Sequence, residues 1–130
     1  MQDSDNKTKN RHIGKQFEDY AVEYLKGKGY HIVERNYRFR RYGEVDVIAR
    51  VGDIICFVEV KSRRNDFFGT PAEAVTYYKK NKITFLAEHY LAQNNLSDMA
   101  VRFDVIEIYF SRYNDEEYSV ESINHIEDAF

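Results

Sequence analysis

The sequence has one cysteine, no long apolar run and no overall excess of positive charge. The lone thiol, Cys56, has no partner for an internal disulfide or for a thiol-ligated metal, which favours a reduced setting. No apolar run reaches the roughly 18 residues that a membrane span needs. The polar first ten residues lack the apolar stretch of a signal peptide. We therefore expect a cytoplasmic protein with no membrane partner.

The net charge of -3 at first argues against a nucleic-acid partner, but the charges are unevenly spread. Residues 1–70 hold 14 Lys and Arg against 11 Asp and Glu, whereas residues 113–130 hold six acids and no Lys or Arg. The local electrostatic field matters more than the net charge of the chain when a polyanion is steered to a surface. The acidic tail therefore does not exclude a nucleic-acid partner for the rest of the chain.

A chain of 130 residues is long enough for one domain with one core. We expect a domain over residues 11–112 and a disordered tail over residues 1–10. Residues 113–130 form an acidic extension that contributes an edge strand near residues 118–123.

Within the domain, the sequence pattern predicts the order helix-strand-strand-strand-helix-strand. Apolar residues at three- and four-residue spacing predict the first helix, and a capping signal at Thr70 and Pro71 predicts the start of the second. The expected helices cover about residues 11–28 and 70–93, and the expected strands about residues 31–38, 44–51, 54–61 and 101–110.

The second and third strands predict a hairpin because Gly52-Asp53 is a dipeptide typical of two-residue turns. In that register Val51 pairs with Ile54, and Asp46 lies directly opposite Glu59. Side chains alternate along a strand, so one face of the hairpin carries a charged group consisting of Glu44, Asp46, Glu59 and Lys61.

Two carboxylates held directly opposite one another repel unless a cation or a proton lies between them. Carboxylate oxygens are the ligands that Mg²⁺ prefers, and a divalent ion activates water for attack on a phosphodiester. We expect Asp46 and Glu59 to bind Mg²⁺ or Mn²⁺, with the Val60 carbonyl as a third ligand. Lys61 would position the water or offset developing charge. Glu44 has a simpler interpretation, as an ion-pair partner of Lys61 across the hairpin.

These residues resemble a known signature. Asp46 followed by Glu59-Val60-Lys61 resembles the motif of the restriction-endonuclease-like PD-(D/E)XK nuclease superfamily. Glu18, at the border of the apolar face of the first helix, resembles the extra helical acid of the Holliday-junction resolvase branch. The alternative for Glu18 is a solvated glutamate.

A longer series of motifs is similar to the YraN family of small bacterial proteins. It covers about residues 14–110 and consists of Gly14…Glu18 with Ala21 and Leu25, Gly29-Tyr30, Arg35-Asn36-Tyr37-Arg38, Gly43 to Ile48, Phe57 to Arg63, and Arg102 to Ile106. The resemblance implies an α/β fold with a restriction-endonuclease-like three-layer core and a central mixed sheet of about four to five strands. It also implies catalytic roles for Glu18, Asp46, Glu59 and Lys61.

Cationic residues flank this expected site. Residues 37–42 alternate aromatic rings with arginines, which suit base stacking and phosphate pairing, although a solvated strand edge with inward rings is equally compatible. Lys79 and Lys82 fall on the apolar face of the second helix, where they either extend to solvent or point at a charged cleft. The expected nucleic-acid contacts are Arg38, Arg40, Arg41, Arg63, Arg64, Lys79 and Lys82.

We therefore predict a metal-dependent endonuclease that hydrolyses DNA. Analogy with the resolvases suggests branched or structured DNA as the substrate and is compatible with a homodimer. RNA stays an alternative substrate. One rival is a nucleic-acid-binding module of the same fold that does not cut. Another is a structural or interaction protein in which the acids form a neutralised cluster.

Overall fold

The structure is a computed structural model that describes residues 2–64, 77–112, 114 and 117–130, with side chains described from residue 14 in the first helix and from residue 79 in the second. Within these residues, two helices and five strands follow one another in sequence. Their bounds are α1 (Gln2–Gly27), β1 (His31–Arg38), β2 (Glu44–Val51), β3 (Ile54–Arg64), α2 (Tyr77–Gln93), β4 (Ala100–Arg112) and β5 (Tyr118–Ile126).

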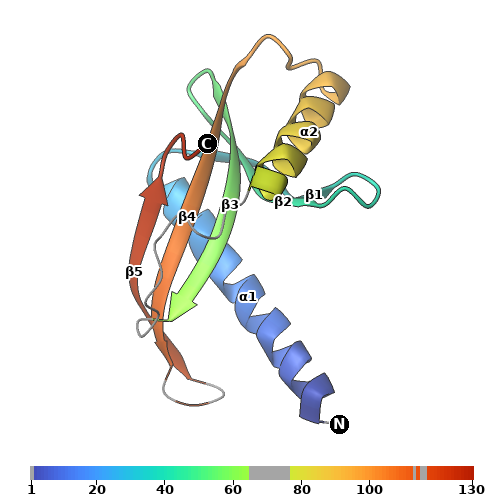
Figure 1. Ribbon diagram of the computed structural model, residues 1–130. Coiled ribbons are helices and arrows are strands. Elements are labelled where there is room, and N and C mark those ends of the chain that lie inside the picture. The colour runs from blue at the N-terminus through green and yellow to red at the C-terminus, as the bar shows by residue number, and fades with distance from the viewer. Residues whose placement is uncertain (1, 65–76, 113, 115–116) are drawn as a thin grey trace.

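The five strands form one mixed sheet in the order β1-β2-β3-β4-β5. β3 and β4 pair in parallel, and the other neighbours pair antiparallel. A parallel pair needs a crossover connection, which here contains α2. α1 covers one face of the sheet and α2 the other (Figure 1), so the predicted α/β class and three-layer core are confirmed.

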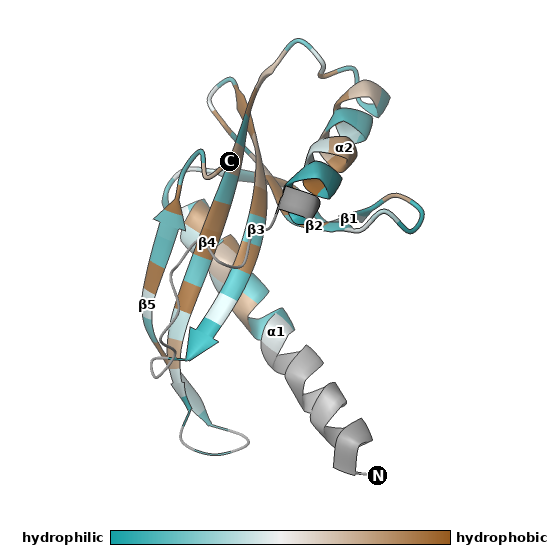
Figure 2. Ribbon diagram, viewed as in Figure 1, coloured by the Kyte–Doolittle hydropathy of each residue, from teal (hydrophilic) through white to brown (hydrophobic). Residues whose placement is uncertain are grey.

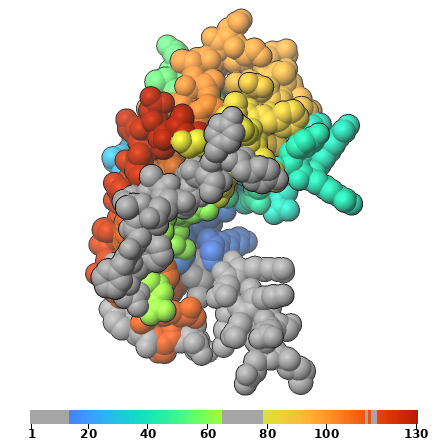
Figure 3. All heavy atoms as spheres, viewed as in Figure 1, coloured from blue at the N-terminus to red at the C-terminus, as the bar shows by residue number. Residues whose placement is uncertain are grey.

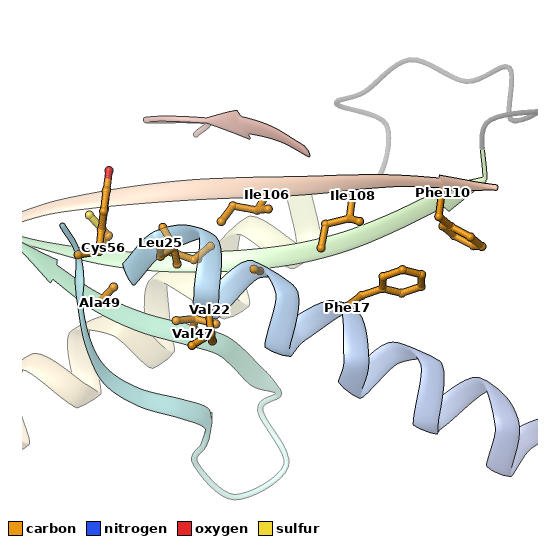
Figure 4. Close-up of a cluster of buried hydrophobic side chains, with 12 residues drawn as sticks. Phe17, Val22, Leu25, Val47, Ala49, Cys56, Ile106, Ile108 and Phe110 are labelled. Atoms are coloured by element: carbon orange, nitrogen blue, oxygen red, sulfur yellow. The ribbon is translucent and has the colours of Figure 1, made fainter. Parts of the chain in front are cut away.

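The core between α1 and the sheet follows from the helical spacing of the first helix. Phe17, Ala21 and Leu25 lie at four-residue intervals and are at most 1% exposed. They pack on alternate residues of the central strands, including Val47 and Val58 (Figure 4). Burial of this stripe is what fixes α1, and with it Glu18, against the sheet.

The core between α2 and the sheet is built from the other set of alternate strand residues. Leu86 and Tyr90 of α2 pack with Ile48 of β2 and Phe57 of β3. Towards its carboxyl end β3 turns hydrophilic (Figure 2), because Glu59, Lys61 and Ser62 follow its apolar half. The polar end of β3 is where the predicted motif lies.

The predicted hairpin is confirmed over its first five pairs. Val51 pairs with Ile54 across the Gly52-Asp53 turn, and the ladder continues to Val47 opposite Val58. It stops there, one residue before the predicted pair of Asp46 with Glu59, so the prediction of a regular ladder through that pair was wrong.

The ends of the chain differ from the expected boundaries. α1 begins at Gln2 and takes in residues 2–10, for which the sequence predicted a disordered tail. The acidic extension contributes β5, which pairs with β4 at the edge of the sheet and is longer than the strand predicted near residues 118–123. The predicted helix cap at Thr70 and Pro71 lies outside the described residues. In the described part of the chain, neither helix is long and apolar enough to cross a membrane.

Candidate metal centre

Asp46 lies at a point where β1 and β2 both change the face to which their side chains point. In a regular strand, residues two apart share a face. Yet Val45 packs on the α2 side of the sheet and Val47 on the α1 side. Opposite them on β1, Tyr37 packs on the α2 side while Arg35 reaches acids of α1. The switch is therefore shared by the two paired strands.

A left-handed residue on β1 accompanies the switch. Asn36 has a φ of 55° and lies between Arg35 and Tyr37, whose partners on β2 flank Asp46. Asparagine is one of the few non-glycine residues that adopt this conformation readily. The side-chain amide of Asn36 donates a hydrogen bond of 2.9 Å to Oε1 of Glu18, which links this irregular position of β1 to α1.

Because of the switch, Asp46 is not part of the β2–β3 ladder, and its side chain contacts the backbone of β3 instead. Oδ2 of Asp46 accepts a hydrogen bond of 2.8 Å from the backbone N–H of Val60. The side chain thereby joins the start of β2 to the polar end of β3. This bond fixes the carboxylate beside the motif at Glu59, Val60 and Lys61.

Three carboxylates converge at this point. Glu18 of α1 and Glu44 and Asp46 of β2 each offer one oxygen, and these oxygens lie within 4.8 Å of one another. Asp46 and Glu18 also line an open cavity of about 220 Å³ together with Val60 and Ser62 of β3. Figure 3 shows atoms of α1 (blue) and β3 (green) reaching the surface beneath the β1–β2 loop (turquoise).

Two of these acids also pair with arginines. Oε1 of Glu18 accepts a hydrogen bond of 3.2 Å from Arg35, and Oε2 of Glu44 accepts one of 2.7 Å from Arg38. Each bond uses one oxygen of the acid, and a carboxylate has a second oxygen with its own lone pairs. The pairing holds the acids in place and leaves an oxygen of each carboxylate with lone pairs that can bind a metal ion.

The ionised form of Asp46 is disfavoured in the folded protein. Burial raises its pKa from 3.8 to about 7, and the charges of Glu59, Glu18 and Glu44 add to the effect, while the Val60 hydrogen bond opposes it. Perturbed acids of this kind gather at functional sites, because a cation that binds there removes the repulsion. Three hard oxygen donors, of which those of Glu18 and Asp46 line an open cavity, fit Mg²⁺ or Mn²⁺.

Glu59 lies next to this cluster and is held by two lysines. Its carboxylate pairs with Lys61 at 3.3 Å and forms a close ion pair with Lys79 of α2. Burial acts to lower the pKa of Lys79, but the hydrogen bonds with Glu59 and Lys61 and the nearby carboxylate charges together outweigh burial and raise the pKa. Burial lowers the pKa of Lys61, and neighbouring Lys79 adds to that effect.

The structure thus brings the predicted catalytic residues to one end of the sheet in two adjoining groups. Asp46 lies with Glu18, while Glu59 lies with Lys61, and the charge of Glu59 still acts on Asp46. The predicted ligand set of Asp46, Glu59 and the Val60 carbonyl stays a prediction. The sequence placed Glu44 on the charged face with Asp46 but assigned it an ion pair with Lys61, whereas in the structure Glu44 pairs with Arg38 and joins Glu18 and Asp46.

The predicted nucleic-acid contacts fall into different places. Arg40 and Arg41 are exposed in the loop after β1, and Arg38 precedes them on the same edge. Arg64 is exposed at the end of β3. Arg63 instead donates to the fully buried Glu107, with a bond of 3.0 Å, so it is part of the interior.

The two lysines predicted on α2 also differ. Lys79 reaches the charged group at Glu59, which favours the charged-cleft interpretation over extension to solvent. Lys82 lies against the β1–β2 loop, where a Cβ added at Gly43 would lie 3.9 Å from its Cδ. Both lysines therefore flank the same end of the sheet as the carboxylates.

The chain was also compared with known proteins. The family described as "Uncharacterised protein family UPF0102" matches residues 17–108. A UPF0102 protein of Acetivibrio thermocellus is 45% identical over 125 residues, which cover 96% of this chain and 95% of the relative. One of Clostridium kluyveri is 47% identical over 121 residues, covering 93% of this chain and 95% of the relative. One of Dictyoglomus turgidum is 47% identical over 102 residues.

Proposed function

The chain belongs to the uncharacterised protein family UPF0102, and for it we propose the function of a metal-dependent endonuclease that hydrolyses phosphodiester bonds in DNA. The observation that carries the proposal is the convergence of Glu18, Glu44 and Asp46 within 4.8 Å, beside Glu59 and Lys61. The order Asp46…Glu59-Val60-Lys61 is similar to the signature of the restriction-endonuclease-like superfamily. We infer that the chain belongs there too.

The carboxylates are assigned to metal binding. Asp46 and Glu59 are the expected ligands with the Val60 carbonyl, and Glu18 and Glu44 enlarge the acidic group around Asp46. A divalent ion supplies charge neutralisation at the phosphate and makes water a better nucleophile at neutral pH. Because the pKa of Asp46 is raised to about 7, a cation that binds there competes with the proton at neutral and lower pH.

The two lysines at Glu59 have separate roles in this proposal. Lys79, whose pKa is raised, stays charged and neutralises Glu59. Lys61, whose pKa is lowered, is suited to orient the attacking water or to offset charge that develops on the phosphate. Arginines such as Arg40 and Arg41 would contact phosphates, which positions a nucleic acid without reading its sequence.

A cleavage assay tests the proposal. Plasmid, single-stranded and four-way-junction DNA, with an RNA of matching sequence, are incubated with the protein and Mg²⁺ or Mn²⁺. We expect cleavage of DNA that EDTA abolishes and that falls at least about 100-fold in a double variant, Asp46→Ala with Glu59→Ala. The matched control is Asp53→Ala, an exposed aspartate in the turn of the same hairpin.

Two results would contradict the proposal. One is equal cleavage by the double variant, which would trace the activity to a contaminant. The other is salt-sensitive binding of every substrate with no cleavage under any metal, which would support a binding module instead.

A further inference from the structure

Four aromatic side chains meet where the β1–β2 loop contacts α2. The ring of Phe39 stacks on His89 with centroids 3.6 Å apart, and Tyr42 lies 4.6 Å from Phe85. Phe39 and Tyr42 are nearly parallel, with an angle of 5° between their planes. We refer to Phe39, Tyr42, Phe85 and His89 as the aromatic platform. Figure 1 shows the β1–β2 loop projecting from the body of the molecule beside α2.

The outer rings of the platform face water. Tyr42 is 45% exposed and Phe85 is 40% exposed, although each touches another large ring. Single exposed apolar side chains are common, but adjoining exposed rings mark a contact surface. Tyr42 and Phe85 are therefore available to a flat partner.

The loop that presents these rings has an unusual backbone. Arg40 has a φ of 54° and Gly43 a φ of 132°, and the N–H of Tyr42 donates to the carbonyl of Phe39 at 3.2 Å. A left-handed arginine costs on the order of 1 kcal/mol, and strain of this kind collects at binding sites. The turn brings Phe39 and Tyr42 into their parallel arrangement.

The surroundings of the platform are cationic. The guanidinium of Arg40 lies 5.1 Å above the ring of Phe39, and Arg41 is exposed next to it. Lys82 lies against Gly43 at the base of the loop. The cores of protein–protein interfaces are depleted of charge, whereas rings among cations suit a strand that offers bases and phosphates together.

The platform lies close in sequence to the carboxylates, because Tyr42 belongs to the loop that leads directly into β2. Tyr42 is four residues from Asp46, which corresponds to at most roughly 13 Å at about 3.3 Å per residue. A base stacked on Tyr42 would therefore be at most about four stacked nucleotides, at about 3.4 Å each, from a phosphate at Asp46. Bases inside a duplex are covered on both faces by the neighbouring pairs, so the platform favours unpaired bases, whose faces are exposed.

We propose that the aromatic platform binds unpaired bases by stacking, so that the substrate of the endonuclease is DNA with a single-stranded segment beside the cleavage position. The assignment of the cleavage position rests on the proposed function. The binding of unpaired bases does not, because it uses rings that lie outside the carboxylate group.

The test measures binding in EDTA, where no cleavage takes place. A labelled duplex with a single-stranded flap and a fully paired duplex of the same sequence are titrated and followed by fluorescence anisotropy. 2-Aminopurine in the flap reports stacking through quenching of its fluorescence. Tyr42→Ala and Phe85→Ala remove exposed rings, and Tyr42→Phe keeps the ring. The matched control is Tyr20→Ala, since Tyr20 on α1 is 48% exposed and outside the platform.

We expect each alanine variant on the platform to lose roughly fivefold to 100-fold in affinity for the flap, with lost quenching and little change for the paired duplex. Tyr42→Phe and Tyr20→Ala should bind as the wild type does. Wild-type affinity and quenching in Tyr42→Ala and Phe85→Ala would overturn the inference. It would also be overturned if Tyr42→Ala broke a dimer in sedimentation but left flap affinity unchanged, because the rings would then join two copies.

These results separate the two proposals. If no DNA is cut but flap binding depends on Tyr42, the endonuclease proposal fails and the platform stands. If Asp46-dependent cleavage is found while the platform variants bind normally, the platform fails and the endonuclease stands.

Discussion

Two aspartates of the same sheet have opposite charge environments. Asp104 on β4 is fully buried and is bound by Arg102 at 2.8 and 2.9 Å, by His125 at 2.8 Å and by the N–H of Asp128 at 3.0 Å. Burial acts to raise its pKa, but the hydrogen bonds from His125, Arg102 and Asp128 and the charge of Arg102 together outweigh burial and lower the pKa to about 2. Asp104 thus ties β5 and the C-terminal residues to β4.

Asp46 on β2 has the reverse arrangement. It accepts one backbone hydrogen bond from Val60, and its neighbours include the acids Glu18, Glu44 and Glu59. Its pKa is raised to about 7. The chain supplies cations to an aspartate that holds the structure together, whereas the aspartate in the open cavity is surrounded by charge of its own sign. The contrast distinguishes a structural acid from one that is suited to bind a cation.

The largest effect is expected at the structural acid. Asp104→Asn leaves the half-buried Arg102 without its counter-charge and removes an acceptor oxygen from the group that Arg102, His125 and Asp128 contact, so we expect the free energy of unfolding to fall by about 3–5 kcal/mol. Urea denaturation at neutral pH measures it, with Asp53→Asn as the exposed control. A loss below about 1 kcal/mol would remove the distinction between the two aspartates.

The second effect has the opposite sign. Asp46→Asn keeps an oxygen for the Val60 N–H but removes the charge, so we expect the metal-free protein to gain roughly 2–4 kcal/mol at about pH 8. Because the folded-state pKa is raised above the ordinary value of 3.8, the wild type loses stability as the pH rises towards about 7. The gain should therefore grow from pH 4 to about pH 7 and then level off. A variant less stable than the wild type at pH 8 contradicts this.

A divalent ion should offset most of the stability difference between those two proteins. At 100 times its dissociation constant, an ion that binds only the folded state stabilises it by about 2.7 kcal/mol. We expect Mn²⁺ to raise the denaturation temperature of the wild type and to leave that of Asp46→Asn unchanged. Equal stabilisation of both proteins would mean that the ion binds elsewhere.

The smallest effect is expected for the exposed ion pair beside the cluster. The side chain of Arg38 is 70% exposed, so Arg38→Gln should change the free energy of unfolding by less than about 1 kcal/mol, even though its pair with Glu44 is 2.7 Å long. DNA affinity should fall uniformly across sequences, with a shallower dependence on salt. A sequence-selective loss would assign Arg38 to base contacts instead.

Much of the fold follows from local signals in the sequence. The Gly52-Asp53 turn predicted the hairpin register, and helical spacing predicted the buried face of α1. Each depends on residues close in sequence or on one regular period. Local patterns therefore located the carboxylates at one end of the sheet.

The rest of the site depends on irregularity and on distant contacts. Alternation predicted Glu44 and Asp46 on the face of Glu59, and the shared switch at Asn36 and Asp46 breaks that alternation. Asn36 was a signal in the sequence, because asparagine tolerates a positive φ. Many asparagines in strands nevertheless have an ordinary extended backbone, so the residue type alone does not predict the switch. Partners that lie far along the chain, such as Lys79 for Glu59 and His125 for Asp104, are fixed by tertiary packing.

The central claim, that the carboxylates around Asp46 bind a divalent ion, is tested most directly by titration calorimetry of Mn²⁺ into metal-free wild type and Asp46→Asn. Binding to the wild type should be about tenfold weaker at about pH 6 than at about pH 8, because Asp46 must release its proton. Asp46→Asn should show at least about 100-fold weaker binding at both values. Binding of equal strength to the two proteins, or no binding to the wild type, would contradict the account.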